Sequence, residues 1–234
     1  MKHAACLALL ALSAALLPGL GRAEDCPGPD HPAITVKIQE GEVKEDRTLS
    51  IIALSKLPSA SKRSGMEAYD HTLGLTQADV GADADLEFLT VPRGGGFCTT
   101  ARETVVTLKW SSTVHLAAEL AAGSCLERVV GAHEQKHVAL DRALLPVGRE
   151  AIEIALQSAL RSGAVGGTAD ESRNALQQKA RKAISGAIDI FAEVRTRRQL
   201  ELDSPEEYDK VPKACGVIEY WRLMLQADKK KADS

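Results

Sequence analysis

The spacing of apolar residues changes near the middle of the chain. In the first half, short β-rich runs such as Ile34 to Ile38 and Thr48 to Leu54 alternate with clusters of Gly, Pro, Ser and Asp, as is typical of strands joined by loops. In the second half, apolar residues recur every three or four positions, the period of an amphipathic helix. The sequence therefore predicts an α+β fold. An N-terminal antiparallel β-rich half, 24–122, would pack on a C-terminal helical half of the same domain, 123–228, followed by a tail at 229–234.

The first long helix is predicted to begin directly after Ser124. Ser124 and Glu127 have the spacing of a capping box, in which the serine oxygen accepts from an early backbone N–H and the glutamate reaches back. The apolar positions that follow lie on one side of the helical wheel, and His133 and His137 lie on that same side. A kink or break is expected at Pro146.

Further helices follow a glycine-rich stop at 163–167. A second long helix is expected from about Ala169 to Arg198, and its apolar stripe would pair it with the first helix as an antiparallel hairpin. Ser204-Pro205 predicts another helix start, because proline suits the first turn. A last short helix is expected from Val217 to Gln226.

The N-terminal residues have the features of a secretory signal peptide. Lys2 precedes an apolar run at 4–17, which ends at Pro18-Gly19, and small residues lead up to Ala23. We therefore expect residues 1–23 to be removed and the protein to be exported, to a periplasm or out of the cell. No later segment approaches the roughly 20 apolar residues of a membrane span, so no membrane association is expected after signal removal.

Charge and cysteine content narrow the function classes. The formal net charge of −3 becomes about −5 once the signal is removed, and no basic stripe with interleaved aromatic residues occurs. Nucleic acid is therefore not expected as a partner. An even number of cysteines in an oxidising compartment predicts two disulfides among the four that remain, which permit three pairings. These are Cys26, Cys98, Cys125 and Cys215.

A predicted β hairpin favours one of these pairings. The runs from Arg102 to Trp110 and from Val114 to Leu120 have strand character, and Ser111-Ser112-Thr113 lies between them as a short turn. A hairpin centred on that turn would place Cys98 opposite Cys125. We therefore expect a Cys98–Cys125 disulfide at the base of the hairpin, with Cys26–Cys215 joining the two ends of the chain.

The candidate chemistry lies in the sequence from His133 to His137, which reads H-E-x-x-H. Residues four apart on a helix project from the same face, so the two imidazoles can bind one zinc ion at about 2.0 to 2.1 Å. Glu134 lies at the rim of the same site. As a general base it would take a proton from the attacking water and deliver it to the leaving amine, while the metal polarises the carbonyl.

The segment from Val130 to Ala139 resembles the active helix of the zincin metallopeptidases. More narrowly, the chain resembles the predicted secreted zinc-dependent proteases of bacteria over about residues 100–145. The features that carry this resemblance are an export signal, a β hairpin and Gly-Ser-Cys followed by this helix. The resemblance implies zinc as the cofactor and a peptide or protein as the substrate. Lys136 departs from the usual zincin pattern, which has uncharged residues between the glutamate and the second histidine.

The resemblance also directs the search for a third metal ligand. In gluzincin-type sites this ligand is a glutamate from the following helix, and the hairpin register brings residues 193–201 toward the histidines. Glu201 lies closer to the apolar stripe than Glu193 and is the preferred candidate, although a surface salt bridge is an equally good role for it. His115 and Glu119 on the predicted hairpin are further candidates.

Two other polar residues have possible supporting roles. Asp141 follows His137 by one turn, which places its short side chain too far along the axis to reach the ion. Its expected role is in the second shell, where it would accept a hydrogen bond from an imidazole N–H. Tyr208 could donate a hydrogen bond to a developing oxyanion, as tyrosines do in several zincins, or could simply pack with its hydroxyl in water.

Two alternatives to an enzyme stay open at this point. In one, the protein is a non-catalytic envelope protein that uses this fold to bind another protein or a cell-wall component, and the charged Lys136 favours it. In the other, it is a structural domain held together by disulfides, with His133 and His137 packed in the core. The second alternative predicts that melting does not depend on metal.

Overall fold

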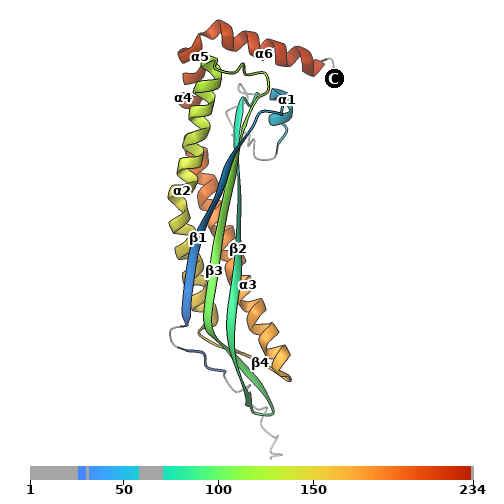
Figure 1. Ribbon diagram of the computed structural model, residues 1–234, viewed down its shortest axis with the longest axis vertical. Helices are drawn as coiled ribbons and strands as arrows, with labels where there is room; N and C mark the ends of the chain where they lie inside the picture. The colour runs from blue at the N-terminus through green and yellow to red at the C-terminus, as the bar shows by residue number, and fades with distance from the viewer. Residues whose placement is uncertain (1–25, 30–31, 58–70, 233–234) are drawn as a thin grey trace, which may run out of the picture.

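The computed structural model describes residues 26–29, 32–57 and 71–232, so the expected signal peptide, 1–23, lies outside the described residues. The described chain is α+β, as the sequence predicts, with a β-rich N-terminal part and a helical C-terminal part (Figure 1). Its elements are, in order, β1 (Ala33–Asp46), α1 (Ile51–Leu54), β2 (Gly74–Arg93), β3 (Gly96–Leu116), α2 (Cys125–Leu160), β4 (Ala164–Gly166), α3 (Ala169–Leu202), α4 (Pro205–Tyr208), α5 (Lys210–Cys215) and α6 (Val217–Ala232).

The sheet is mixed, which corrects the expectation of an antiparallel one. Its strand order is β1-β3-β2, with β4 added on β3. The chain turns tightly from β2 into β3 at Gly94 and Gly95, both of which have positive φ. Strand β3 then runs back between β2 and β1, so it pairs antiparallel with β2 and parallel with β1.

The hairpin expected around Ser111 to Thr113 does not form, because β3 continues through it as a single strand. Ser112 pairs with Val43 on one side and with Ala78 on the other, so both neighbouring strands hold it extended. Its buried hydroxyl donates to the backbone oxygen of Gln77 at 3.1 Å. The run at Ile51–Leu54 is also not a strand: it forms α1, for which Ser50 is the N-cap.

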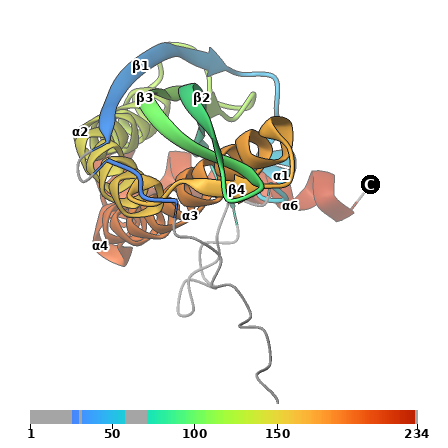
Figure 2. The same cartoon turned by 90° about the horizontal axis from the view of Figure 1, so that it is seen from below.

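Two long helices, α2 and α3, cover one face of the sheet (Figure 2). Helix α2 packs against β1 and β3, and α3 packs against β2 and β3. Along β3, alternate side chains point into this interface and are buried, as a half-covered sheet requires. The core is formed by apolar residues of the sheet and of both helices. Among them are Val106, Leu108 and Trp110 of β3, Leu145, Ile152 and Leu156 of α2, and Leu176 and Phe191 of α3.

Helices α2 and α3 form the expected antiparallel hairpin, but α2 is not broken at Pro146. Pro146 lies on the exposed side of the helix, where water can satisfy the carbonyl that loses its partner. Gly148 lies on the opposite, buried side. A Cβ at that position would be 3.2 Å from the ring of Phe191 and 3.3 Å from Leu108, so glycine lets α2 approach both α3 and β3 closely.

The disulfides join Cys26 to Cys98 and Cys125 to Cys215, so the predicted pairing is wrong. A strand of 21 residues spans roughly 70 Å at about 3.3 Å per residue. Because β3 is uninterrupted, Cys98 and Cys125 lie toward opposite ends of the molecule. Cys98 is near β4, where the carbonyl of Cys26 accepts from the Gly163 N–H at 2.8 Å. Cys215, at the end of α5, lies beside the start of α2.

Both disulfides are compatible with an oxidising, exported environment. Among the described residues, no helix combines the length and the apolar character needed to cross a bilayer. The last helix, α6, continues past the expected end at Gln226, so the residues treated as a tail are largely helical.

Peptide mapping without reduction tests this connectivity. We expect one linked fragment pair containing Cys26 and Cys98 and a second containing Cys125 and Cys215, because the Cα atoms of each pair lie 5.6 Å and 5.4 Å apart. Mass spectrometry of the unreduced digest identifies both. A fragment that links Cys98 to Cys125 would contradict the uninterrupted strand β3.

Candidate metal centre

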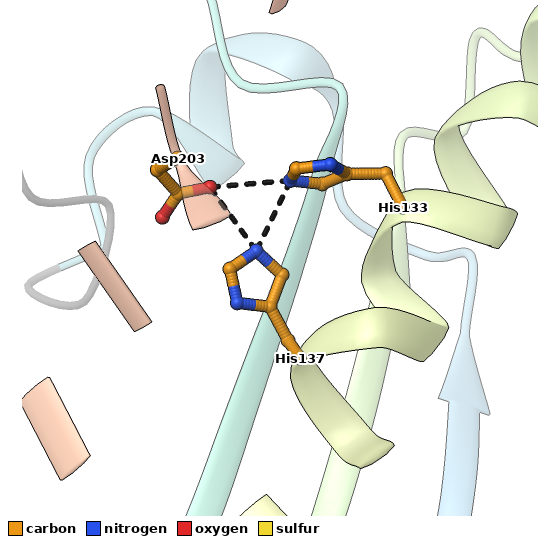
Figure 3. A group of neighbouring side chains, drawn as sticks. All are labelled: His133, His137 and Asp203. Atoms are coloured by element: carbon orange, nitrogen blue, oxygen red, sulfur yellow. Dashed lines mark hydrogen bonds and ion pairs between the residues drawn. The ribbon is translucent and has the colours of Figure 1, made fainter. Parts of the chain in front are cut away.

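Three potential ligand atoms converge where the end of α3 meets the first half of α2 (Figure 3). His133 and His137 project from the same face of α2, as their spacing predicts, and Asp203 directly follows α3 as its C-cap. Asp203 Oδ1 lies 3.2 Å from His133 Nε2 and 3.1 Å from His137 Nε2. The two Nε2 atoms lie 3.1 Å apart. The three atoms therefore form a nearly equilateral triangle.

This triangle fits a metal ion. Imidazole nitrogens and carboxylate oxygens bind ions such as zinc at about 2.0 to 2.2 Å, which in tetrahedral geometry puts neighbouring ligand atoms roughly 3.3 to 3.6 Å apart. The separations of 3.1 and 3.2 Å are close to that value. Among the residues that the structure describes, no other group of His, Cys, Asp and Glu side chains has this arrangement. The group could hold a metal ion.

A hydrogen-bond network orients the imidazole of His137. Its Nδ1 contacts Oε1 of Gln199, so Nδ1 is the donor and Nε2 is the nitrogen that faces the triangle. The amide of Gln199 has its direction fixed in turn, because its Nε2 donates to the His137 carbonyl at 3.2 Å and to Asp141. No motif in the sequence marks Gln199 as part of a site.

Asp141 supports the site through Gln199 and not by direct contact with an imidazole. Its carboxylate is 1% exposed and accepts two hydrogen bonds from Arg195, at 2.6 and 2.8 Å. The prediction that Asp141 accepts directly from an imidazole N–H is wrong, because Gln199 lies between Asp141 and His137 and bonds to both. These hydrogen bonds form a series that runs from Arg195 through Asp141 and Gln199 to His137, and it joins α3 to α2 next to the triangle. In metal sites, residues that hydrogen-bond to the ligands orient them in this way.

The charges of the triangle are strongly coupled. Burial alone would raise the pKa of Asp203, but hydrogen bonds from His133 and His137 outweigh it and hold that pKa well below its usual range. Burial likewise opposes protonation of His137, yet Asp203 and then Glu134 raise its pKa to about 9. These shifts favour a protonated His137 beside an ionised Asp203. Metal binding would displace that proton, since ligand nitrogens must be deprotonated.

Glu134 is buried beside the triangle and against the start of β2. Its Oε2 accepts a hydrogen bond from the hydroxyl of Thr76 at 2.8 Å. A Cβ on Gly74 would lie 2.7 Å from Oε1 of Glu134, so only glycine leaves room for this carboxylate. Burial raises the pKa of Glu134, although the nearby His137 and the Thr76 hydroxyl act in the opposite direction.

A small cavity of about 50 Å³ opens next to His133 and Glu134. Tyr208 of α4 lines it, with its ring centroid 6.0 Å from that of His133. Burial, followed by the charge of Asp203, raises the pKa of Tyr208 above its ordinary value, so the phenol stays protonated and can donate a hydrogen bond. A water molecule needs about 10 to 15 Å³ of such volume, so the cavity has room for water and a small part of a ligand.

Lys136, the charged residue within the motif, attaches α4 to α2. Its Nζ donates to Oε2 of Glu207 at 2.7 Å, and the same oxygen lies 3.9 Å from Nδ1 of His133. The ion pairs with Lys136 and then Lys210 lower the pKa of Glu207 to about 2. Lys136 therefore helps to place the segment that contains Tyr208.

The other ligand candidates do not join the triangle. Glu201 is exposed and pairs with Arg198 at 2.8 Å, so Asp203, slightly further along the chain, takes the position expected for it. Glu193 is also exposed. His115 contacts Asp46 and Gln77, both at 3.0 Å. Glu119 accepts from the first backbone N–H of α1 at 3.0 Å.

No known protein family, curated protein or solved structure matches this chain. The candidate metal centre is therefore defined by its geometry alone: two histidines from one helix and a carboxylate from the end of its partner.

Paired substitutions of neighbouring acidic residues test the third ligand. We expect Asp203→Ala to lose bound metal, and to weaken its affinity by more than the roughly 10- to 100-fold that an outer-shell change costs, because one of three ligand atoms is removed. Glu201→Ala, which removes an exposed carboxylate of similar charge, should leave metal content unchanged. Elemental analysis of the purified variants gives the comparison. Equal metal content in the two variants would contradict the assignment of Asp203.

Proposed function

We propose that the protein is an exported zinc-dependent metallopeptidase that hydrolyses peptide bonds. The observation that supports this most strongly is the convergence of His133 Nε2, His137 Nε2 and Asp203 Oδ1 beside a buried glutamate. Three protein ligands with a fourth position free are typical of catalytic zinc sites, whereas structural sites are closed by four. The sequence H-E-x-x-H and its likeness to zincin active helices point to the same class.

Zinc is the proposed ion because of the donor set. Two imidazoles and one carboxylate suit zinc, while calcium and magnesium prefer all-oxygen sites. Bound in this way, zinc supplies a Lewis acid that activates water and polarises a carbonyl. The chain's own contribution is to fix the ligands, through the network from Arg195 to His137, before the ion arrives.

Glu134 is the proposed general base. Its carboxylate follows His133 on the same helix and lines the same cavity. Burial raises its pKa toward the working pH, which improves its ability to accept a proton from the attacking water and to return it to the leaving amine. Thr76 holds one carboxylate oxygen, which leaves Oε1 free of that bond to exchange the proton.

Tyr208 is the proposed donor to the oxyanion that develops on the substrate carbonyl. It borders the cavity together with His133 and Glu134, and its protonated phenol can donate there. The pair between Lys136 and Glu207 keeps α4 in place, so the phenol is positioned by contacts that do not themselves touch the substrate.

A structural metal site in a non-catalytic envelope protein is the second candidate. The small size of the cavity, about 50 Å³, favours it, because an extended peptide needs an open cleft. In that case the ion would join the end of α3 to α2, and Glu134 would serve only to pack against β2. The two candidates differ in whether Glu134 is needed for more than stability.

Glu134→Gln separates the two candidates. We expect hydrolysis to fall by about 100- to 10,000-fold because the base is lost, while zinc content stays stoichiometric because the ligands remain. The measurement is cleavage of a mixed library of internally quenched peptides, followed by mass spectrometry of the products. Glu193→Gln, which changes an exposed glutamate on α3, is the matched control and should retain activity.

The same experiment contains the contrary outcome. A wild-type protein with stoichiometric zinc that cleaves no peptide in the library, or a Glu134→Gln variant as active as wild type, would remove the peptidase proposal and leave the structural site. A wild-type protein that does not bind zinc would contradict both the peptidase and the structural metal site.

A further inference from the structure

Helix α6 lies across one end of the elongated molecule and crosses the direction of the strands and of α2 (Figure 1). One face of it is attached to the body. Met224 and Ala227 are buried there, and Asp228 pairs with His71 at 2.9 Å. The Cys125–Cys215 disulfide fixes the residues that lead into the helix. Helix α6 is therefore held firmly by its inner face.

The outer face of α6 is apolar although it is open to solvent. Four large hydrophobic side chains on it are 53 to 77% exposed, and they follow the helical spacing that places them side by side. They are Val217, Ile218, Trp221 and Leu225. Together with Arg222, Gln226 and Lys229 they border a shallow groove of about 580 Å³. Exposed apolar residues are common singly, but a contiguous row usually marks an interaction surface.

The groove has cationic borders. Arg222 and Lys229 line it beside the apolar row, and its lining includes no acidic residue. Lys230 follows Lys229 and pairs with Glu119 at 3.7 Å. The chain as a whole is acidic, with a formal charge of −3, so this basic end differs from the rest of the molecule. An anionic surface would attract the α6 end and repel the remainder, which would orient the protein with α6 toward the surface.

We propose that the outer face of α6 docks on the surface of an anionic phospholipid bilayer. Tryptophan, leucine and isoleucine on one face with arginine and lysine beside them are typical of helices that lie in the membrane interface. The apolar row would enter the boundary between headgroups and acyl chains, and the cations would contact the phosphates. Since α6 covers the end of the molecule, neither the sheet nor the α2–α3 hairpin obstructs a flat surface there.

A second copy of the chain is a less suitable occupant. In a two-fold dimer the same patch meets itself, which would bring Arg222 and Lys229 of both copies to one apolar seam. Like charges at such a seam oppose association. On an anionic bilayer, by contrast, Arg222 and Lys229 would face phosphate groups of opposite charge.

This inference revises the expectation that the mature chain stays off membranes. That expectation rested on the lack of an apolar run long enough to span a bilayer, and a helix that lies on the surface needs no such run. The inference is independent of the metal centre, because it uses no residue of the triangle.

Tryptophan fluorescence gives a direct test, because the sequence has two tryptophans and Trp110 is only 2% exposed. The protein is purified after export, with its N-terminus verified by mass spectrometry so that the apolar run at 4–17 does not contribute. It is titrated with vesicles of equal parts phosphatidylglycerol and phosphatidylcholine. We expect co-sedimentation and a blue shift from Trp221, at least about tenfold weaker partition into pure phosphatidylcholine, and release by salt.

Two variants make the test specific. Ile218→Ser with Leu225→Ser should weaken binding to the anionic vesicles by about tenfold or more, because the apolar row is lost while the charges stay. Ile190→Ser removes an equally exposed isoleucine on α3, which is 61% exposed, and should bind like wild type. All these positions are exposed, so melting temperatures should not change.

Three results would overturn the proposal. One is the absence of both co-sedimentation and a blue shift with the anionic vesicles. Another is equal partition of wild type and the Ile218→Ser, Leu225→Ser variant. The third is a concentration-dependent dimer in the absence of lipid that this double variant abolishes, since α6 would then be covered by a second copy.

Discussion

The register of α3 against α2 brings together the three side chains that could hold a metal ion. Two imidazoles one helical turn apart need a third ligand, and among the described residues the carboxylate that meets them lies where α3 ends. Close packing at Gly148 and the buried pair of Arg195 with Asp141 hold the two helices in that register. A slip of one turn would move Asp203 by about 5.4 Å along the axis and out of reach of the imidazoles. The packing between α2 and α3 therefore also sets the position of Asp203 relative to the two imidazoles.

Local signals predicted the elements that depend on local physics. The α+β class is confirmed, and the predicted start of α2 after Ser124 is confirmed too, because the Ser124 side chain caps the Glu127 N–H. The shared face of His133 and His137 follows from helical periodicity alone. Strand pairing is different, because it depends on neighbours that are remote in sequence. The Ser111 to Thr113 segment reads as a turn by composition, yet β1 and β2 on either side keep it extended.

The predicted disulfide pairing and the predicted third ligand differ from the structure for separate reasons. A hairpin within β3 would bring Cys98 and Cys125 together, whereas the intact strand separates them and each pairs with a cysteine at its own end. The helical wheel favours Glu201 over Glu193, but it does not reach Asp203, which is the C-cap of α3. The carboxylate that lies with the two imidazoles belongs instead to Asp203, which ends the helix just before Ser204-Pro205. Gln199 could not be found from sequence, because its role exists only through contacts with His137 and Asp141.

The C-terminal segment connects the site to the proposed membrane surface. It supplies Asp203, then Glu207 and Tyr208 beside the cavity, and then passes through the Cys215 disulfide into α6. The proposed catalytic centre and the apolar face of α6 therefore lie toward the same end of the molecule (Figure 1). The opposite end, around β4 and the Cys26–Cys98 disulfide, is remote from both.

X-ray absorption at the zinc edge, measured on protein purified without added metal chelators, tests the central claim most directly. The proposal predicts one zinc per chain with a first shell of nitrogen and oxygen at about 2.0 to 2.1 Å and the multiple-scattering pattern of two imidazoles. Zinc bound through sulfur, a shell with fewer than two imidazoles, or no bound zinc would contradict the convergence of His133, His137 and Asp203 on a metal ion.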